Sequence, residues 1–452
     1  MRVAACAVSS MLLSLPALAQ ERPDPQLLAF VNQIRAVDHH THALPVRAPG
    51  SAASTPADPL GTSPPFFSAR QRETNPEWIE AWRALYGYPH RDASAEHVRE
   101  AFDAKQRVLE EKGADYPAWI LDRAGIDVAV VNAPALGRGQ TSPRFRWVPY
   151  VDGFLFPFAL TESPANPSPA RRTEVGLDTA PPPPWSDYLA SVGSRLREWK
   201  ANGAVAVKFT TAYYRSLDVQ RVAEADARII YDRYLQDPQP RDFRAAEYKT
   251  LQDFLFRYVA REAGRAGLAV HIHTGEGGGP LFGVAGSNPL LLESVLNDFS
   301  LSQTTTFVLV HGGAPFDRSV GALIQKPNVY ADISGQTFFH TRHDLSETLR
   351  PWLWAFPEKI LFGTDAFTAT PLRGWEEMTW LATRSGREAL ALALTQMLAA
   401  GDITRPRAEE IARMVLRDNA VRLYKAGAVN LGAVIETVRE RRSADCADRR
   451  RR

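Results

Sequence analysis

Eight short apolar segments set the pattern of this 452-residue chain. Most are followed by a polar or glycine-containing turn, as buried parallel strands are, and helical stretches such as 245–266, 289–298 and 374–383 lie between them. Eight strands that alternate with helical crossovers predict an α/β fold of the (β/α)8, or TIM-barrel, class. The predicted strands are residues 36–40, 126–132, 145–151, 204–209, 268–273, 306–311, 329–333 and 359–362.

Two predicted insertions are longer than the loops of a minimal barrel. Residues 45–114 start as an Ala/Ser/Pro-rich loop and continue as helices that carry Trp78, Trp82 and Tyr86. Residues 163–184 end in four consecutive prolines. Long loops often form lids or substrate walls at the catalytic mouth of a barrel, so we expect both insertions there, with surface decoration as the alternative.

The first 19 residues have the pattern of a secretory signal peptide. Met1 and Arg2 give a charged start, an apolar run follows, and residues 17–19 supply a small-x-small cleavage signal. The run is too short to span a bilayer, so we expect an exported protein, periplasmic or secreted, with no membrane insertion after cleavage. Cleavage would leave Cys446 as the single cysteine, so the core rather than an internal disulfide must stabilise the fold.

Composition and charge indicate a folded protein and argue against a nucleic-acid-binding one. The chain is 45% hydrophobic and 23% charged, which is typical of a folded soluble protein. Residues 439–452 form a basic tail that we expect to be disordered. The tail contributes +4 and Arg2 contributes +1 to the total charge of +2, which leaves −3 for the predicted domain (20–438) and argues against nucleic acid as a partner. The pattern of residues 387–400 and 406–415 predicts extra C-terminal helices. The sequence is compatible with a monomer and with a homo-oligomer.

Two His-x-His pairs stand where predicted strands end. They are His40/His42 and His271/His273, whereas ten histidines in 452 residues give about 0.2 such pairs by chance. Side chains at positions i and i+2 of a strand face the same way, so each pair can bind one cation. The C-terminal ends of barrel strands are also where active sites lie.

There are two more residues of metal-ligand type at predicted strand ends. His311 ends strand 306–311, and Asp365 closely follows strand 359–362. A single histidine at a strand end is usually a satisfied core residue, but four strand ends of this kind together favour a metal site. Neutral imidazoles and one carboxylate suit a divalent ion, with zinc as the first choice and one or two ions per chain.

Lys208 ends another apolar strand, in a chain with only eight lysines among its 53 Lys and Arg residues. A buried lysine has a lowered pKa and can react or be carboxylated, and the alternative is an ammonium group paired with a carboxylate. The residues alone leave these two interpretations even.

These residues resemble the amidohydrolase superfamily of metal-dependent hydrolases, from about residue 38 to residue 424. Shorter segments are similar to its amidohydrolase-related branch, which includes the N-terminal domain of FluG-type and nodulin-like proteins. They are residues 208–213 (Lys-Phe-Thr-Thr-Ala-Tyr), 273–277 (His-Thr-Gly-Glu-Gly), 287–290 (Ser-Asn-Pro-Leu), 311–316 (His-Gly-Gly-Ala-Pro-Phe) and 419–424 (Asn-Ala-Val-Arg-Leu-Tyr).

The resemblance implies a role for each matched residue. Lys208 matches a position that is carboxylated and bridges two metals in the binuclear members, whereas many relatives in this branch use one metal and an unmodified residue there. The resemblance implies attack by metal-activated water, with Asp365 as general base and then acid, and with His311 or the metal polarising the carbonyl oxygen. The matched metal ligands are His40, His42, His273, His311 and Asp365.

Four further residues are candidate substrate contacts. Tyr213 and Arg215 lie on the loop after the strand that holds Lys208, where Arg215 can pair with a substrate carboxylate or be an ordinary surface residue. Glu276 and His271 lie on either side of the His-Thr-Gly motif, where His271 is a neighbour of the ligands rather than a ligand.

We therefore expect a hydrolase that cleaves an amide, ester or lactone bond of a small-molecule substrate. The resemblance to the FluG-type branch also hints at an acidic, γ-glutamyl-like amide. A metal-dependent non-oxidative decarboxylase is the alternative enzyme, because the wider branch contains such enzymes. A binding protein that has lost turnover is the third interpretation.

Overall fold

All eight predicted strands form in the part of the chain that the structure describes. This part of the computed structural model comprises residues 22–43, 59–61, 67–158, 168–177, 182–237, 242, 245–278 and 282–424. The predicted signal peptide and basic tail lie outside it, as do parts of both insertions. The strands are β1 (Ala36–Thr41), β2 (Ile126–Asn132), β3 (Phe145–Val148), β4 (Ala206–Phe209), β5 (Ala269–His273), β6 (Phe307–Val310), β7 (Val329–Asp332) and β8 (Ile360–Leu361).

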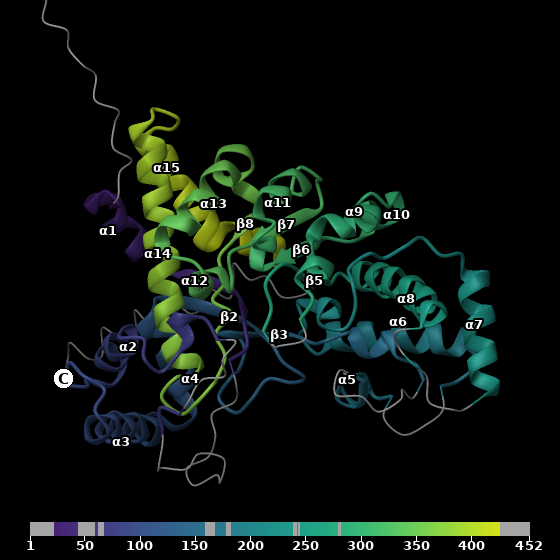
Figure 1. Cartoon of the computed structure of the whole chain (residues 1–452), viewed down its shortest axis with the longest axis horizontal. Helices are drawn as coiled ribbons and strands as arrows, with labels where there is room; N and C mark the ends of the chain where they lie inside the picture. The colour runs from purple at the N-terminus through teal and green to yellow at the C-terminus, as the bar shows by residue number, and fades with distance from the viewer. Residues whose placement is uncertain are drawn as a thin grey trace, which may run out of the picture.

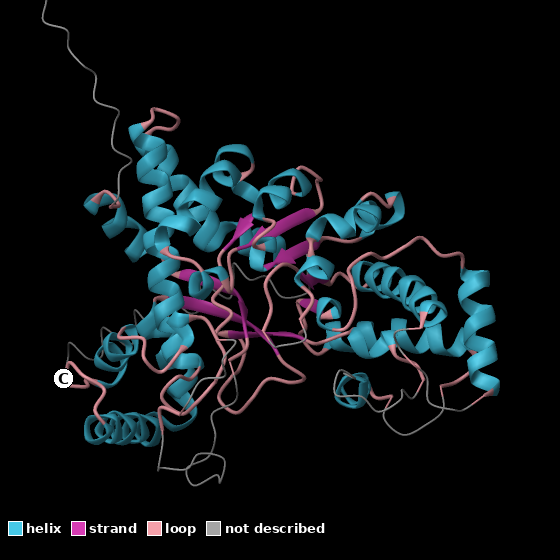
Figure 2. Ribbon diagram, in the orientation of Figure 1, coloured by secondary structure: helices cyan, strands magenta, loops and turns pink. Residues whose placement is uncertain are grey.

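The strands form a parallel barrel at the centre of the molecule (Figure 2). They pair in chain order, as one sheet of β1 to β3 and one of β4 to β8. Parallel bridges from Trp147 to Ala204 and from Tyr150 to Lys208 join β3 to β4. On the other side, the His39 backbone N–H donates to the carbonyl oxygen that follows β8 (2.9 Å). These contacts complete the circle of strands, so the predicted barrel class is confirmed.

The interior of the barrel is apolar at the end where the strands begin. Small aliphatic side chains from seven strands form one buried cluster there, and Tyr424 and Ala420 of the last helix, α16 (Asn419–Tyr424), pack into it. Every second side chain of a strand points into the barrel. At the opposite end, where the strands finish, these inward side chains are polar. The strand residues of the cluster are Val37, Val128, Val130, Val148, Ala206, Ala269, Val308, Val310 and Leu361.

Helices surround the strands (Figure 1). In the described residues none is long and apolar enough to cross a bilayer. Those of the first two-thirds of the chain are α1 (Pro25–Gln33), α2 (Glu77–Tyr86), α3 (Ala95–Lys112), α4 (Tyr116–Ala124), α5 (Ser168–Val175), α6 (Trp185–Ala201), α7 (Glu224–Gln236), α8 (Ala246–Arg265), α9 (Glu293–Leu296) and α10 (Phe299–Thr304). The later helices are α11 (Asp317–Leu323), α12 (Gln336–Phe339), α13 (Arg342–Ala355), α14 (Trp375–Ala399) and α15 (Arg405–Arg413), followed by α16.

One helix prediction is corrected by the structure. The helices expected at 374–383 and 387–400 are a single helix, α14, that continues through Gly386. This glycine lies against the barrel, where an added Cβ would come within 2.9 Å of the Phe362 ring. The glycine therefore allows close packing of helix on strand and does not interrupt the helix.

The first insertion packs its helices against α14. Trp78 and Trp82 of α2 are fully buried, and the Trp82 indole donates to the backbone oxygen of Leu372 (2.8 Å). From α3, the ammonium group of Lys105 reaches the Glu377 carboxylate of α14 (3.0 Å). A large part of this insertion is therefore built into the core, and its second half is not a loose surface loop.

Candidate metal and active site

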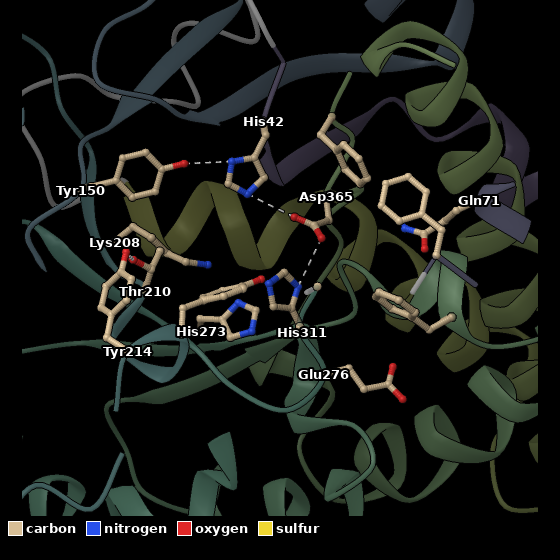
Figure 3. Close-up of a pocket in the computed structure, with 16 residues that line it drawn as sticks. His42, Gln71, Tyr150, Lys208, Thr210, Tyr214, His273, Glu276, His311 and Asp365 are labelled. Carbon is tan, nitrogen blue, oxygen red and sulfur yellow. Dashed lines mark hydrogen bonds and ion pairs between the residues drawn. The ribbon is translucent and has the colours of Figure 1, made fainter. Parts of the chain in front are cut away.

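Five side chains of metal-ligand type meet at the mouth of the barrel, where the strands end. Figure 3 shows four of them, His42, His273, His311 and Asp365. The Oδ1 atom of Asp365 lies 3.2 Å from Nε2 of His40 and 3.3 Å from Nε2 of His42. On the other side, Oδ2 of Asp365 lies 3.8 Å from Nδ1 of His311. The His273 ring follows next to His311, with ring centroids 4.6 Å apart. The ligand atoms of His40, His311 and Asp365 are close enough together to share one ion.

The backbone is strained at two of these residues. His311 (φ 70°) and Asp365 (φ 56°) are the non-glycine residues with positive φ in the described part of the chain. A left-handed backbone at such residues costs of order 1–3 kcal/mol and persists only where the surroundings hold it. Here the His311 N–H donates to Asp332 Oδ1 (2.7 Å), and the Asp365 N–H donates to the His40 carbonyl (2.8 Å). The strain turns both side chains toward the cluster.

A second layer of polar groups orients His40 of β1 and His42, which directly follows this strand. The Asn132 side-chain amide lies 2.8 Å from His40 Nδ1, and the Tyr150 hydroxyl lies 3.0 Å from His42 Nδ1. The Tyr150 hydroxyl can accept a hydrogen bond from His42 Nδ1–H through its oxygen. The structure places Asn132 Nδ2 against His40 and leaves Oδ1 of the same amide buried without a hydrogen-bond partner, so a flip of the amide would let Oδ1 accept from His40 Nδ1–H. Each histidine would then present the lone pair of Nε2 to a metal ion, as metal-ligating histidines do.

The donor set fits a divalent cation. His273 Nε2 is buried and has no hydrogen-bond partner among the described residues, as expected of an imidazole whose partner is a metal ion. Burial lowers the pKa of His40 and His273 well below the ordinary value and that of His311 to about 4, so all three imidazoles are neutral at pH 7. Burial acts to raise the pKa of Asp365, but the neighbouring histidines hold it well below its usual range. The side chains therefore have the protonation states that ligands require.

Lys208 lies beneath this cluster with its ammonium group directed at it (Figure 3). The side chain is buried, and Nζ lies 3.5 Å from His40 Nε2. Burial lowers the pKa of Lys208 to about 8, although Asp365 and Asp332 act in the opposite direction. The ammonium group is thus in contact with a predicted metal ligand, and it would repel a cation held there.

A cavity of ≈ 580 Å³ opens above these residues. Two of the candidate substrate contacts, Tyr213 and Glu276, line it, and Glu276 Oε2 is buried with no hydrogen-bond partner among the described residues. Burial raises the pKa of Glu276. The aromatic residues of the wall are Phe67, Tyr150, Tyr213, Tyr214, Phe339 and Phe367.

The insertions contribute unequally to the wall. Phe67 and Gln71 come from the first insertion, so the prediction that it lines the mouth is confirmed for this part. Of the second insertion, no described residue lines the cavity, and α5 instead contacts the turn after β3.

Two predicted substrate contacts lie elsewhere. The Arg215 guanidinium pairs with Asp253 of α8 (2.5 Å) and donates to the Asp218 carbonyl, so it supports the loop and does not face the cavity. His271 is fully buried inside the barrel, where its Nε2 lies 2.9 Å from the Tyr424 hydroxyl. His271 is two residues before His273, so both side chains point to the same side of β5. The His271 side chain lies deeper in the barrel than that of His273.

Sequence reasoning missed Asn132 and Tyr150. Asn132 is the last residue of β2, and Tyr150 closely follows β3. Each could have been found by the rule that identified the histidines, namely a polar side chain where a buried strand ends. Asn and Tyr side chains do not by themselves suggest a metal site, because they are not typical metal ligands. Their effect here is to orient a neighbouring histidine.

A parallel barrel that gathers histidines and one aspartate at its strand ends defines the class of metal-dependent barrel proteins. Residues 221–426 match the family model described as amidohydrolase. The chain is also 28% identical to protein fluG of Emericella nidulans over 258 residues, which are 53% of this chain and 28% of that protein. Together with the motifs and the fold, these two matches confirm the predicted resemblance to the amidohydrolase superfamily. They also support the prediction that the protein is an enzyme.

Solved structures show the same fold at low sequence identity. A candidate metal-dependent hydrolase of Lactobacillus casei has a TM-score of 0.64 and 18% identity, over 89% of this chain and 98% of that chain. A glucuronate isomerase of Caulobacter crescentus has a TM-score of 0.63 and 14% identity, over 90% and 96%. A uronate isomerase of Thermotoga maritima has a TM-score of 0.61 and 13% identity, over 91% and 100%. The fold is therefore shared with a candidate hydrolase and with isomerases, and it does not choose between these reactions.

Proposed function

We propose that this protein is a metal-dependent hydrolase that cleaves an amide, ester or lactone bond of a small molecule. The observation that carries the proposal is the convergence of four histidines, Asp365 and Lys208 at the base of one cavity. A divalent cation bound there, with zinc as our first choice, supplies Lewis acidity and lowers the pKa of a water molecule.

Asp365 is the residue to which we assign proton transfer. Its carboxylate is held deprotonated by the histidines around it, and 19% of its side chain is exposed toward the cavity. It can accept a proton from the attacking water and return that proton to the leaving group. The His40 carbonyl holds the Asp365 N–H, so the carboxylate keeps its position while it exchanges the proton.

We further propose that Lys208 is carboxylated and that the site takes two ions. Its neutral amine would form an N–C bond with carbon dioxide and release one proton, which gives a carbamate anion. The change removes a positive charge 3.5 Å from His40 Nε2 and supplies two oxygen donors at the base of the cluster. The residues that would hold the two ions are His40, His42, His273, His311 and Asp365, together with the carbamate of Lys208.

The cavity wall favours a neutral, largely apolar substrate. Six aromatic side chains line it, and Lys208 is the one Lys or Arg among the described lining residues. Because Arg215 is paired with Asp253, the wall offers no guanidinium to a substrate carboxylate, whereas Glu276 would oppose one. We therefore do not retain the acidic amide that the resemblance hinted at.

Metal content and product analysis test the proposal together. The chain purified without added metal should contain about two ions at the barrel site, so Lys208→Ala should contain at least one ion fewer per chain than the wild type while its circular dichroism is unchanged. Aryl amides, esters and lactones should be hydrolysed. Release of carbon dioxide from aromatic acids without hydrolysis would instead establish the decarboxylase. One ion in both variants would overturn the carboxylated lysine but not the hydrolase, and no metal under any loading condition would overturn both.

A further inference from the structure

A second group of histidines and carboxylates lies on the first insertion, at the turn from α2 to α3. The His90 and His97 rings stack face to face, with centroids 3.5 Å apart and an interplanar angle of 7°. Nε2 of His90 lies 2.8 Å from Glu100 Oε2, and Nδ1 of His97 lies 2.8 Å from Asp92 Oδ1. The group shares no residue with the barrel site, and α3 lies at the outer edge of the molecule at the lower left of Figure 1.

A carboxylate lies against each ring of this stacked pair. The Glu100 carboxylate lies against His90, and the Asp92 carboxylate lies against His97. Imidazole nitrogens with carboxylate oxygens beside them are a donor set that zinc and similar divalent ions take in proteins.

We propose that His90, His97 and Glu100 bind a first-row divalent cation, with zinc as the test ion. One ligand atom from each of the three lies within 4.8 Å of the others. His90 Nε2 lies 2.8 Å from Glu100 Oε2, so a small turn of these two side chains would point both atoms at one ion. His97 and Glu100 share a helix face at i and i+3. Three protein ligands on a partly exposed surface leave one position for water.

Asp92 completes the site without binding the ion. Its carboxylate accepts a hydrogen bond from His97 Nδ1–H, so the lone pair of Nε2 on the same ring can bind the metal ion. The same arrangement is found around metal-bound histidines. The Asp92 carboxylate is fixed in turn by the Ser94 backbone N–H (3.0 Å), just before α3 begins. Tyr88 packs its ring edge-on against His90 and donates its hydroxyl hydrogen to the Asp92 carbonyl. The ion would thus clip the turn of residues 87–94 onto the start of α3.

Zinc titration of matched variants tests this proposal. The chelator-treated wild type, titrated in competition with a chromophoric chelator, should bind one more zinc ion than His97→Gln. Asp92→Asn should retain the ion with an affinity lower by about ten- to hundredfold. His343→Gln on α13 is the control for removal of a histidine, since His343 belongs to neither candidate ligand group in the described residues. Equal stoichiometry in the wild type and His97→Gln would overturn the proposal.

Hydrogen–deuterium exchange gives a readout that the barrel site cannot mimic. Zinc should slow exchange of residues 87–100 in the wild type and leave this segment unchanged in His97→Gln. Hydrolytic activity, measured in parallel, should be the same in both. If zinc slows exchange only around the barrel mouth, the insertion does not bind the ion and the proposal fails.

Discussion

Replacement of Lys105 by methionine should destabilise the protein strongly. Lys105 is buried, and its Nζ lies 3.0 Å from Glu377, 3.1 Å from Glu376 and 2.8 Å from the Pro371 carbonyl. Methionine fills nearly the same volume but removes the positive charge. Two carboxylates would then lie together in the core without a cation.

The size of the effect follows from the partners that remain. Breaking a buried ion pair by removing one member costs about 3–5 kcal/mol of unfolding free energy. Glu377 would keep its hydrogen bonds from the Tyr86 hydroxyl (2.7 Å) and the Gly374 N–H (2.8 Å), so we expect the lower end, about 3 kcal/mol. Lys112→Met is the matched control, because this lysine on the same helix pairs with Glu111 at the surface, where a pair is worth about 0–1 kcal/mol.

The loss should also depend on pH. Burial raises the pKa of Glu376, partly offset by Lys105, so removal of Lys105 raises it further. A carboxyl whose pKa is higher in the folded state binds more protons than in the unfolded state, and stability then falls as pH rises. The deficit of Lys105→Met should therefore be larger at pH 8 than at pH 5.

Urea unfolding followed by tryptophan fluorescence measures both effects, since Trp78 and Trp82 are buried in the insertion that Lys105 anchors. A loss below about 1 kcal/mol in Lys105→Met, or an equal loss in Lys112→Met, would refute the reasoning. So would a deficit that grows as pH falls.

Three further substitutions test the site. Tyr150→Phe removes the group beside His42 Nδ1 and should weaken metal binding about ten- to hundredfold in a chelator competition, so an unchanged affinity would argue against its orienting role. Arg215→Ala should lower the melting temperature through loss of the Asp253 pair and leave KM unchanged, whereas a raised KM with normal stability would restore it as a substrate contact. Asp365→Asn should lower kcat about 10²–10⁴-fold in a metal-loaded enzyme, and normal turnover would exclude it from proton transfer.

The strands and the ligand positions could be predicted from the sequence because both follow local rules. A buried parallel strand is a short apolar run, and a barrel places its chemistry where such runs end. His40, His42, His273, His311 and Asp365 all satisfy this rule, and the structure brings them together. The continuity of α14 depends on a contact between Gly386 and Phe362 that no local pattern contains.

The roles that could not be predicted from the sequence depend on contacts between residues that are distant in the chain. Arg215 sits on a loop after a strand, as a substrate-binding arginine would, but Asp253 lies 38 residues further on and meets it only in the fold. Lys105 and Glu377 are separated by 272 residues, so the anchoring of the first insertion could not be foreseen. The effect of Asn132 and Tyr150 is likewise visible only once His40 and His42 are placed beside them.

The hydroxyl of Tyr424 has a consequence for when the site can form. It contacts His39 Nδ1 and His271 Nε2, so it ties α16 to the two strands that carry His40 and His273. During synthesis, every ligand residue up to Asp365 leaves the ribosome before Tyr424 does. The nascent barrel therefore lacks the side chain that fills its floor, and metal loading should follow completion of the last helix rather than accompany translation.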